Sequence, residues 1–261
     1  MNIPADWQIP EFEVAEISSK QNEYAICVFT INEGLKFQQQ LREMQPLSKK
    51  LDIVIADGGS NDGSTEINFL SENNVKALLT KKGPGKLSAQ MRMAFAFLLS
   101  RGYEGILTVD GNHKDDTSAA PLFSSALNAG YDHVQGSRFV PGGKAVNTPP
   151  FRWLAVRLIH APIISLASGY PYTDTTNGFR AYSARFLLDK RVAPFRNIFV
   201  TYELHYYLAI RAAKLGYRIT EVPVTRSYPA KGKVPTKISP VLGNLQILKV
   251  LLMAAMGKYN P

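Results

Sequence analysis

A short acidic stretch, residues 109–116 (VDGNHKDD), carries the most specific chemistry in this chain. It directly follows an apolar run, residues 105–108, that we expect to be a buried strand. A second acidic strand end, residues 53–60 (IVIADGGS), occurs earlier in the chain. Open α/β sheets bind ligands at the carboxyl ends of their strands, and clustered oxygen ligands suit a hard divalent cation on a diphosphate. The sequence therefore predicts a nucleoside diphosphate site.

Alternating patterns of apolar residues predict the elements that must position these side chains. In the first half we expect strands at residues 24–31, 51–56, 76–79 and 106–109, and helices at 35–44 and 87–100. In the second half we expect strands at 133–136 and 218–224 and helices at 152–167 and 202–215. Pro162 kinks or divides the first of these helices. A Gly/Pro-rich loop is expected at 139–150 and a basic loop at 225–239. This alternation predicts an α/β fold: a Rossmann-like, mostly parallel sheet with helices on both faces, in a single domain over residues 1–240.

The C-terminal residues 241–261 are expected to form an apolar helix. No run of eighteen apolar residues occurs, so we expect no transmembrane helix. Two interpretations of the apolar stretch 241–256 stay open: it packs on the core, or it lies in a membrane interface.

Composition and charge exclude several classes of protein. The 261 residues are 45% hydrophobic and 20% charged, as in ordinary globular domains. The net charge is +9, and the basic excess lies mostly between Arg138 and Lys237, which suits anionic lipid or a phosphate-rich ligand. No nucleic-acid-binding motif is present, so we expect no nucleic acid partner. The single Cys27 and the lack of a signal peptide indicate a reducing, cytoplasmic location.

Two glycine-containing turns are candidate donor-binding loops. In residues 57–63, Asp57 can accept from a base or ribose, and Gly59 lets the backbone approach a ligand; an ordinary strand-to-helix turn is the alternative. Lys86 ends a Gly-Pro-Gly-Lys sequence that lacks the first glycine of a P-loop, since Thr80 stands there. Lys86 is either a phosphate ligand or a solvated lysine at a helix start.

Three further polar groups are candidates for the reaction itself. Arg138, just beyond a predicted strand, suits a bidentate grip on phosphate oxygens. Asp174 begins an Asp-Thr-Thr-Asn-Gly-Phe-Arg segment, and Glu203 begins a predicted helix; caps and core polar pairs are the alternative for both. His205 is expected to be structural rather than a metal ligand, because no partner histidine has ligand spacing.

The order of these segments resembles glycosyltransferase family 2, with its GT-A fold, and within it the dolichyl- or polyprenyl-phosphate mannose synthases. The similar segments are the nucleotide loop at 53–64, the Asp-x-Asp metal motif at 110–112, the phosphate-acceptor segment at 136–143, the element at 174–180 and the closing basic loop at 221–237. The match covers residues 24–239, most of the chain.

By this resemblance, Asp57 contacts the base or ribose of a nucleoside diphosphate sugar, and Asp110 and Asn112 hold Mg²⁺ or Mn²⁺ on its diphosphate. The resemblance assigns phosphate neutralisation to Arg138, Arg180, Arg226 and Lys237. The family reaction is a single displacement with inversion at the anomeric carbon. A phosphate acceptor needs no general base, whereas a hydroxyl acceptor needs one, for which we choose Asp174 or Glu203.

Departures from the family pattern concentrate at the metal motif. Gly58 replaces the second Asp of the nucleotide loop, and Asn112 replaces the second Asp of the metal motif. Lys114 stands where mannose synthases can place a further metal ligand. A lysine there repels a cation, so either the metal affinity is weakened or the lysine partly replaces the metal, and we expect a weak or dispensable metal site. Asp115 and Asp116 are the carboxylates available to compensate.

The sequence thus predicts a cytoplasmic, membrane-peripheral glycosyltransferase that moves a sugar from GDP-mannose, UDP-glucose or a similar donor to polyprenyl phosphate. One alternative is transfer to a sugar hydroxyl in surface polysaccharide or lipopolysaccharide synthesis. Another is a nucleotide-sugar-binding protein without catalysis.

Overall fold

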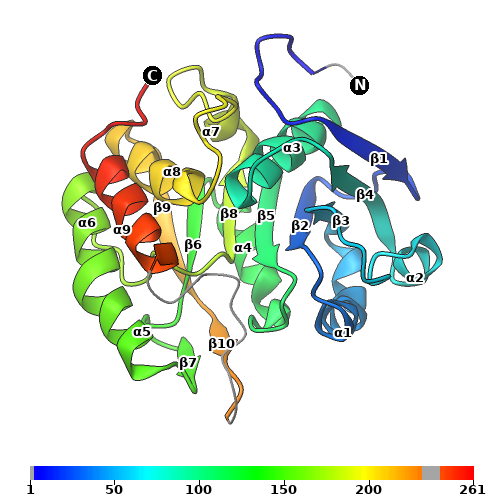
Figure 1. Ribbon diagram of the computed structural model, residues 1–261, viewed down its shortest axis with the longest axis horizontal. Helices are drawn as coiled ribbons and strands as arrows, with labels where there is room; N and C mark the ends of the chain where they lie inside the picture. The colour runs from blue at the N-terminus through cyan, green and yellow to red at the C-terminus, as the bar shows by residue number, and fades with distance from the viewer. Residues whose placement is uncertain (1–2, 231–241) are drawn as a thin grey trace.

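An eight-stranded sheet forms the centre of the computed structural model, which describes residues 3–230 and 242–261 (Figure 1). Its spatial order is β1 (Phe12–Glu16), β4 (Val75–Lys81), β3 (Asp52–Asp57), β2 (Tyr24–Thr30), β5 (Gly105–Asp110), β8 (Arg180–Ser183), β6 (His133–Ser137) and β9 (Ile219–Pro223). Only β1 and β8 pair antiparallel with their neighbours in this sheet. The prediction of a mostly parallel sheet is confirmed.

Successive residues of the central strands bury side chains on opposite faces of the sheet, as the pleat of a strand requires. Cys27 of β2 joins a core with α3 (Leu87–Ser100) and α8 (Glu203–Lys214), whereas its neighbour Val28 joins a core with α1 (Leu35–Met44), α2 (Ile67–Glu72) and α4 (Ala120–Asn128). A strand that is apolar at every position therefore needs a helical layer on each side. The prediction of helices on both faces is confirmed (Figure 1).

Several short elements were not predicted from the sequence. They are β1, β8, α4, α7 (Ala184–Leu188) and two 3₁₀ turns, η1 (Gln45–Lys49) and η2 (Thr117–Ala119). The two predicted loops at 139–150 and 225–239 each contain a short strand, β7 (Lys144–Val146) and β10 (Thr225–Ser227), which pair in parallel. Strands of three residues have too little periodicity to be recognised, and their stability depends on the partner strand.

The predicted helix at 152–167 is one helical segment whose middle turn is widened. It comprises α5 (Pro150–Ala155), a π-helical turn η3 (Val156–His160) and α6 (Ala161–Ser168). Ala161 N–H donates to the Val156 carbonyl five residues back, directly before Pro162. A π turn is a known way to absorb a residue that cannot fit the ordinary ladder. Pro162 therefore widens this helix without dividing it.

The C-terminal helix α9 (Leu242–Ala255) packs beside α6 and α8 (Figure 1). It buries Val250, Leu251 and Ala254, while Leu242 and Leu245 near its start are exposed. Among residues 3–230 and 242–261, no helix has both the length and the apolar character needed to cross a bilayer.

Candidate active site

A cavity of about 840 Å³ opens at the carboxyl ends of β2 and β5. Its wall includes the end of β2 and the turn that follows it, the acidic loop after β5, α5 and the start of α8. In the sheet register, Thr30 of β2 lies opposite Asp57 of β3, and Phe29 lies opposite Asp110 of β5. Both predicted acidic strand ends therefore meet at one edge of the sheet, on either side of β2.

Asp57 is buried and holds its own loop. Ser60 N–H donates to Asp57 Oδ2 at 2.8 Å, and Ser60 Oγ donates to Asp57 Oδ1 at 2.6 Å. Gly59 adopts a φ of +97°, which a side chain would strain. The neighbouring Gly58, not Asp57, lines the cavity. The loop thus forms a tight turn after β3, and the carboxylate of Asp57 is engaged within that turn.

Gly58 makes room for a glutamine from α3. Gln90 Nε2 donates to the carbonyl groups of Thr30 and Ala56, each at 3.1 Å. A Cβ at position 58 would lie 3.2 Å from Gln90 Nε2 and 3.1 Å from Ile31. Gly58 thus stands in place of the second Asp of the family's nucleotide loop, and Gln90 occupies the space beside it.

The acidic loop is held from α1. Gln40 Nε2 donates to the Asp110 carbonyl at 3.0 Å, and His113 N–H donates to Gln40 Oε1 at 2.7 Å. His113 has a φ of +55°, an uncommon conformation for a residue with a side chain. Asp110, Asn112 and Lys114 then line the cavity.

Arg226 of β10 bridges two carboxylates of this loop. Its Nη2 lies 3.1 Å from Asp110 Oδ2, and its Nη1 donates to Asp115 Oδ2. Burial raises the pKa of Asp115 to about 6, although Arg226 acts in the opposite direction. Asp116 instead accepts from Ser118 N–H at the start of η2. Neither carboxylate thus compensates for Asn112 at the metal motif.

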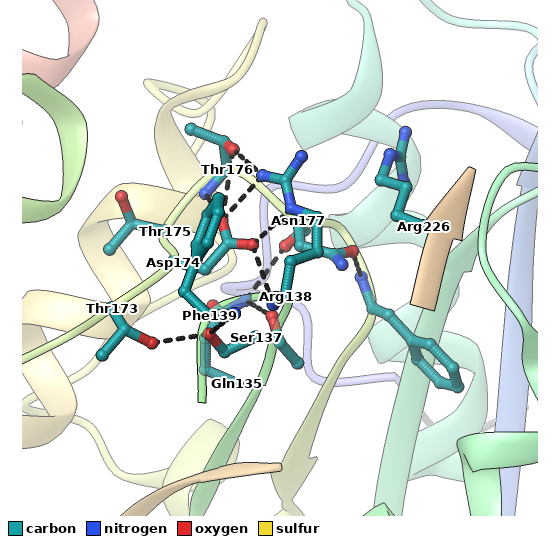
Figure 2. A network of polar contacts seen from close by, with 12 residues as sticks. Gln135, Ser137, Arg138, Phe139, Thr173, Asp174, Thr175, Thr176, Asn177 and Arg226 are labelled. Atoms are coloured by element: carbon teal, nitrogen blue, oxygen red, sulfur yellow. Dashed lines mark hydrogen bonds and ion pairs between the residues drawn. The ribbon is translucent and has the colours of Figure 1, made fainter. Parts of the chain in front are cut away.

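Arg138 and Asp174 form a buried ion pair at the end of β6 (Figure 2). Arg138 Nε donates to Asp174 Oδ2 at 2.6 Å, and its Nη2 donates to Asp174 Oδ1 at 3.0 Å and to Thr176 Oγ1 at 2.8 Å. Burial raises the pKa of Asp174, but Arg138 outweighs burial and holds that pKa below its usual range. Arg138 lines the cavity, whereas Asp174 lies behind it.

Arg180 is almost fully buried under the cavity and is held by backbone carbonyls. Its Nε, Nη1 and Nη2 donate to the carbonyl oxygens of Asn177, His205 and Thr175 at 2.9, 2.6 and 2.7 Å. Burial and Arg180 lower the pKa of His205 well below its ordinary value, so His205 is neutral at neutral pH. The Arg180 guanidinium lines the cavity next to this neutral histidine and supplies a positive charge there.

Three predicted site residues remain: Lys86, Glu203 and Lys237. Lys86 lines the cavity at the start of α3. Glu203 does not line it; its carboxylate accepts from Thr201 N–H and Thr201 Oγ1, each at 2.6 Å. Lys237 lies outside the described residues.

Two residues that line the cavity beside Arg226, Arg152 and Tyr228, were not predicted from the sequence. Arg152 of α5 lies 3.3 Å from Tyr228 Oη through its Nη1, and Lys114 Nζ lies 5.6 Å from the Tyr228 ring centroid. Tyr228 directly follows β10 and stands two residues after Arg226, the spacing that places side chains on one side of an extended segment. Burial disfavours the Tyr228 phenolate, but Arg226 and Arg152 outweigh burial and lower the pKa of Tyr228.

Three buried polar atoms of the cavity residues have no hydrogen-bond partner within the described part of the chain: Thr30 Oγ1, Asn112 Oδ1 and Thr175 Oγ1. Buried polar atoms in proteins are normally paired with protein groups or with ordered water, so these atoms mark a polar part of the cavity wall.

The residues at the metal motif fit a divalent cation poorly. Asp110 Oδ2 already lies 3.1 Å from Arg226 Nη2 and 3.4 Å from Asn112 Nδ2. The unpaired Asn112 Oδ1 suits a cation and a ligand hydroxyl equally. Within residues 3–230 and 242–261, no group of three or more His, Cys, Asp and Glu side chains is arranged to hold a metal.

Known proteins share both the sequence pattern and the fold. No family model matches the chain. It is 31% identical over 193 residues to an undecaprenyl-phosphate mannosyltransferase of Micrococcus luteus, covering 71% of this chain and 74% of that protein. It is 26% identical over 235 residues to a dolichyl-phosphate hexose transferase of Haloferax volcanii, covering 90% and 95%.

A solved structure supports the fold. The crystal structure of glucosyl-3-phosphoglycerate synthase from Mycobacterium tuberculosis, in complex with Mn²⁺, UDP and glucosyl-3-phosphoglycerate, superposes with a TM-score of 0.62 at 15% identity. The match covers 90% of this chain and 80% of that one. Together with the cavity at the strand ends and the order of its loops, these likenesses lead to one conclusion: the chain belongs to the GT-A glycosyltransferases related to the polyprenyl- and dolichyl-phosphate hexose transferases.

Proposed function

We propose that this protein is a hexosyltransferase that moves a sugar from a nucleoside diphosphate sugar to polyprenyl phosphate, with inversion. A phosphate oxygen of the acceptor forms a bond to the anomeric carbon, and the bond to the nucleoside diphosphate breaks. The mannosyltransferase and hexose transferase named above support this reaction, since their names specify undecaprenyl phosphate and dolichyl phosphate. The cavity of about 840 Å³ beside the nucleotide loop has room for a donor of the GDP-mannose or UDP-glucose type.

The single observation that carries this proposal is the charge of the cavity. Eight lysines and arginines line it against two carboxylates, Glu33 and Asp110, among the described residues. A diphosphate and an acceptor phosphate together bring several negative charges to one place, and such a wall neutralises them. A hydroxyl acceptor brings no such charge.

The candidate bases point in the same direction. Asp174 is fully buried and ion-paired to Arg138, and Glu203 is engaged by Thr201 outside the cavity wall. A hydroxyl acceptor needs a carboxylate within reach of its proton, whereas a phosphate acceptor is already a nucleophile. In this proposal Arg138 binds phosphate, Asp174 positions Arg138, and Glu203 stabilises the start of α8.

An apolar surface beside the cavity suits the lipid part of the acceptor. Phe151, Leu154 and Leu158 lie on one face of the segment α5–η3 and are 76%, 46% and 68% exposed. Phe151 also lines the cavity, as does Ile247 of α9. An apolar face that leads into a cationic cavity matches a phosphate with a long hydrocarbon tail. We therefore propose peripheral contact with the cytoplasmic face of a membrane.

The relative from M. tuberculosis was crystallised with Mn²⁺ and UDP, but the metal motif of this chain fits a divalent cation poorly. The proposed activity therefore includes a weak or dispensable requirement for Mg²⁺ or Mn²⁺.

The test is incubation of the purified protein with labelled GDP-mannose or UDP-glucose and polyprenyl phosphate. Formation of a lipid-linked sugar phosphate is the expected result. Transfer only to glycan hydroxyls would replace this proposal with the polysaccharide alternative. Donor binding without turnover on any acceptor would favour a non-catalytic binding protein.

A further inference from the structure

Two cationic side chains stand at the metal motif together with its only acidic member. Arg226 Nη2 lies 3.1 Å from Asp110 Oδ2, and Arg226, Lys114 and Asp110 all line the cavity. Lys114 lies in the loop after β5, whereas Arg226 lies in β10, which follows β9. The arrangement is therefore a tertiary feature and not a local sequence accident.

The backbone fixes the two segments to each other. Ser227 N–H donates to the Lys114 carbonyl at 2.7 Å, and Asp116 N–H donates to the Thr225 carbonyl at 3.0 Å. Asp115 and Arg226 form an antiparallel bridge between these bonds. Because Lys114 and Arg226 are flanked by this short ladder, their positive charges are held at the cavity wall rather than carried on a separate loop.

These charges oppose a divalent cation at Asp110. A cation there would lie beside two like charges and would compete with Arg226 for the same carboxylate. Asn112 adds an amide where a second carboxylate would have strengthened the site. The protein itself thus already supplies positive charge at the place where a divalent cation would bind.

The same groups suit a diphosphate. A guanidinium has five N–H donors, more than its contacts with Asp110 and Asp115 use, and an ammonium has three. Both form charge-assisted hydrogen bonds to phosphate oxygens. Lys114 is only half-buried, so its ammonium can reach a ligand in the cavity.

We propose that Lys114 and Arg226 together take the place of the divalent cation and bind the diphosphate of the donor directly. The inference rests on the proposed function, because it requires a nucleoside diphosphate sugar in this cavity. It makes donor binding independent of metal.

The first experiment is calorimetric titration of the full chain with UDP-glucose and with GDP-mannose, in EDTA and then in Mg²⁺ or Mn²⁺. We expect the Kd of the donor that binds to change by less than about threefold between these conditions. Donor binding that requires metal overturns this inference and leaves the proposed function standing. Failure of both donors to bind in either condition overturns the proposed function, and the inference falls with it.

The second experiment removes one charge. Lys114→Gln should weaken donor binding in EDTA by about tenfold or more, and added Mn²⁺ should recover part of the loss, because the repelling charge is gone. Lys82→Gln, a surface lysine paired with Glu13, is the matched control and should leave the Kd unchanged. A purely structural role of Lys114 predicts no recovery by Mn²⁺. Unchanged donor affinity in Lys114→Gln, or a loss that Mn²⁺ does not touch, would count against the replacement.

Discussion

Gln40 on α1 holds the backbone of His113 in the acidic loop: His113 N–H donates to Gln40 Oε1 at 2.7 Å. The amide of the same side chain donates to the Asp110 carbonyl at 3.0 Å. One buried side chain therefore spans the end of β5 and the loop that presents Asp110 and Lys114 to the cavity. The bond lies at a residue with a φ of +55°, an uncommon conformation that persists only where surrounding contacts hold it.

Replacing Gln40 should loosen the acidic loop. In Gln40→Leu, the His113 N–H loses its partner, which costs about 1–3 kcal/mol in the free energy of unfolding. Donor affinity should fall in addition, since Asp110 and Lys114 lose their fixed position. Gln39→Leu, at the exposed neighbouring position, is the control and should change neither quantity. Chemical denaturation and calorimetry measure the two effects separately; equal donor affinity in Gln40→Leu and wild type would contradict the positioning role.

Variants of the ion pair between Arg138 and Asp174 should separate an effect on stability from an effect on catalysis. Arg138→Gln leaves a buried carboxylate without its partner, and such a break costs about 3–5 kcal/mol. The double variant Arg138→Gln/Asp174→Asn removes both charges and should recover most of that stability. It should not recover turnover, because Arg138 itself lines the cavity. Recovery of activity in the double variant would show that Arg138 does not bind phosphate.

Asp115 should make stability depend on pH between about 4 and about 6. Its pKa in the folded protein is raised to about 6, and an unfolded Asp titrates near about 3.9. The folded state therefore holds the proton more tightly, so the free energy of unfolding falls as pH rises through this range, by about 3 kcal/mol at most. Arg226, Asp110 and Arg138 are the charged groups that act on this carboxylate.

Denaturation curves at several pH values test this dependence. Asp115→Asn should flatten the slope between these limits, whereas Asp116→Asn, its exposed neighbour, should keep the wild-type slope. A wild-type stability that rises with pH through this range in parallel with both variants would refute the assignment.

The apolar face of α5–η3 should bind the lipid acceptor. In Leu154→Ser/Leu158→Ser, two exposed apolar side chains outside the cavity wall are lost, and binding to anionic vesicles should weaken by about tenfold or more. The KM for long-chain polyprenyl phosphate should rise, while turnover of a short, water-soluble prenyl phosphate should change little. Leu188→Ser removes an exposed leucine on α7 and is the control. Vesicle sedimentation and kinetics on the two acceptors provide the measurements, and an equal loss on both acceptors would argue against a lipid-binding face.

The sequence alone was sufficient for the long helices and the central strands of the architecture. Residues 35–44 and 87–100 were predicted as helices and are α1 and α3 with the same bounds, and the runs around residues 24–31 and 106–109 are the adjacent central strands β2 and β5. These elements are long and have a clear apolar period, which is a local property of the chain. The order of the motifs then led to the family, which the comparisons support.

Tertiary structure decided which of the candidate side chains are available for chemistry. Asp57, Asp174 and Glu203 are equally plausible ligands or bases in the sequence, but Ser60, Arg138 and Thr201 engage their carboxylates. The roles of these residues stay predictions. The pair between Asp110 and Arg226 joins positions 116 residues apart. Such pairs arise from the order and register of strands, which bring distant segments to one edge of the sheet, and spacing along the chain contains no information about them.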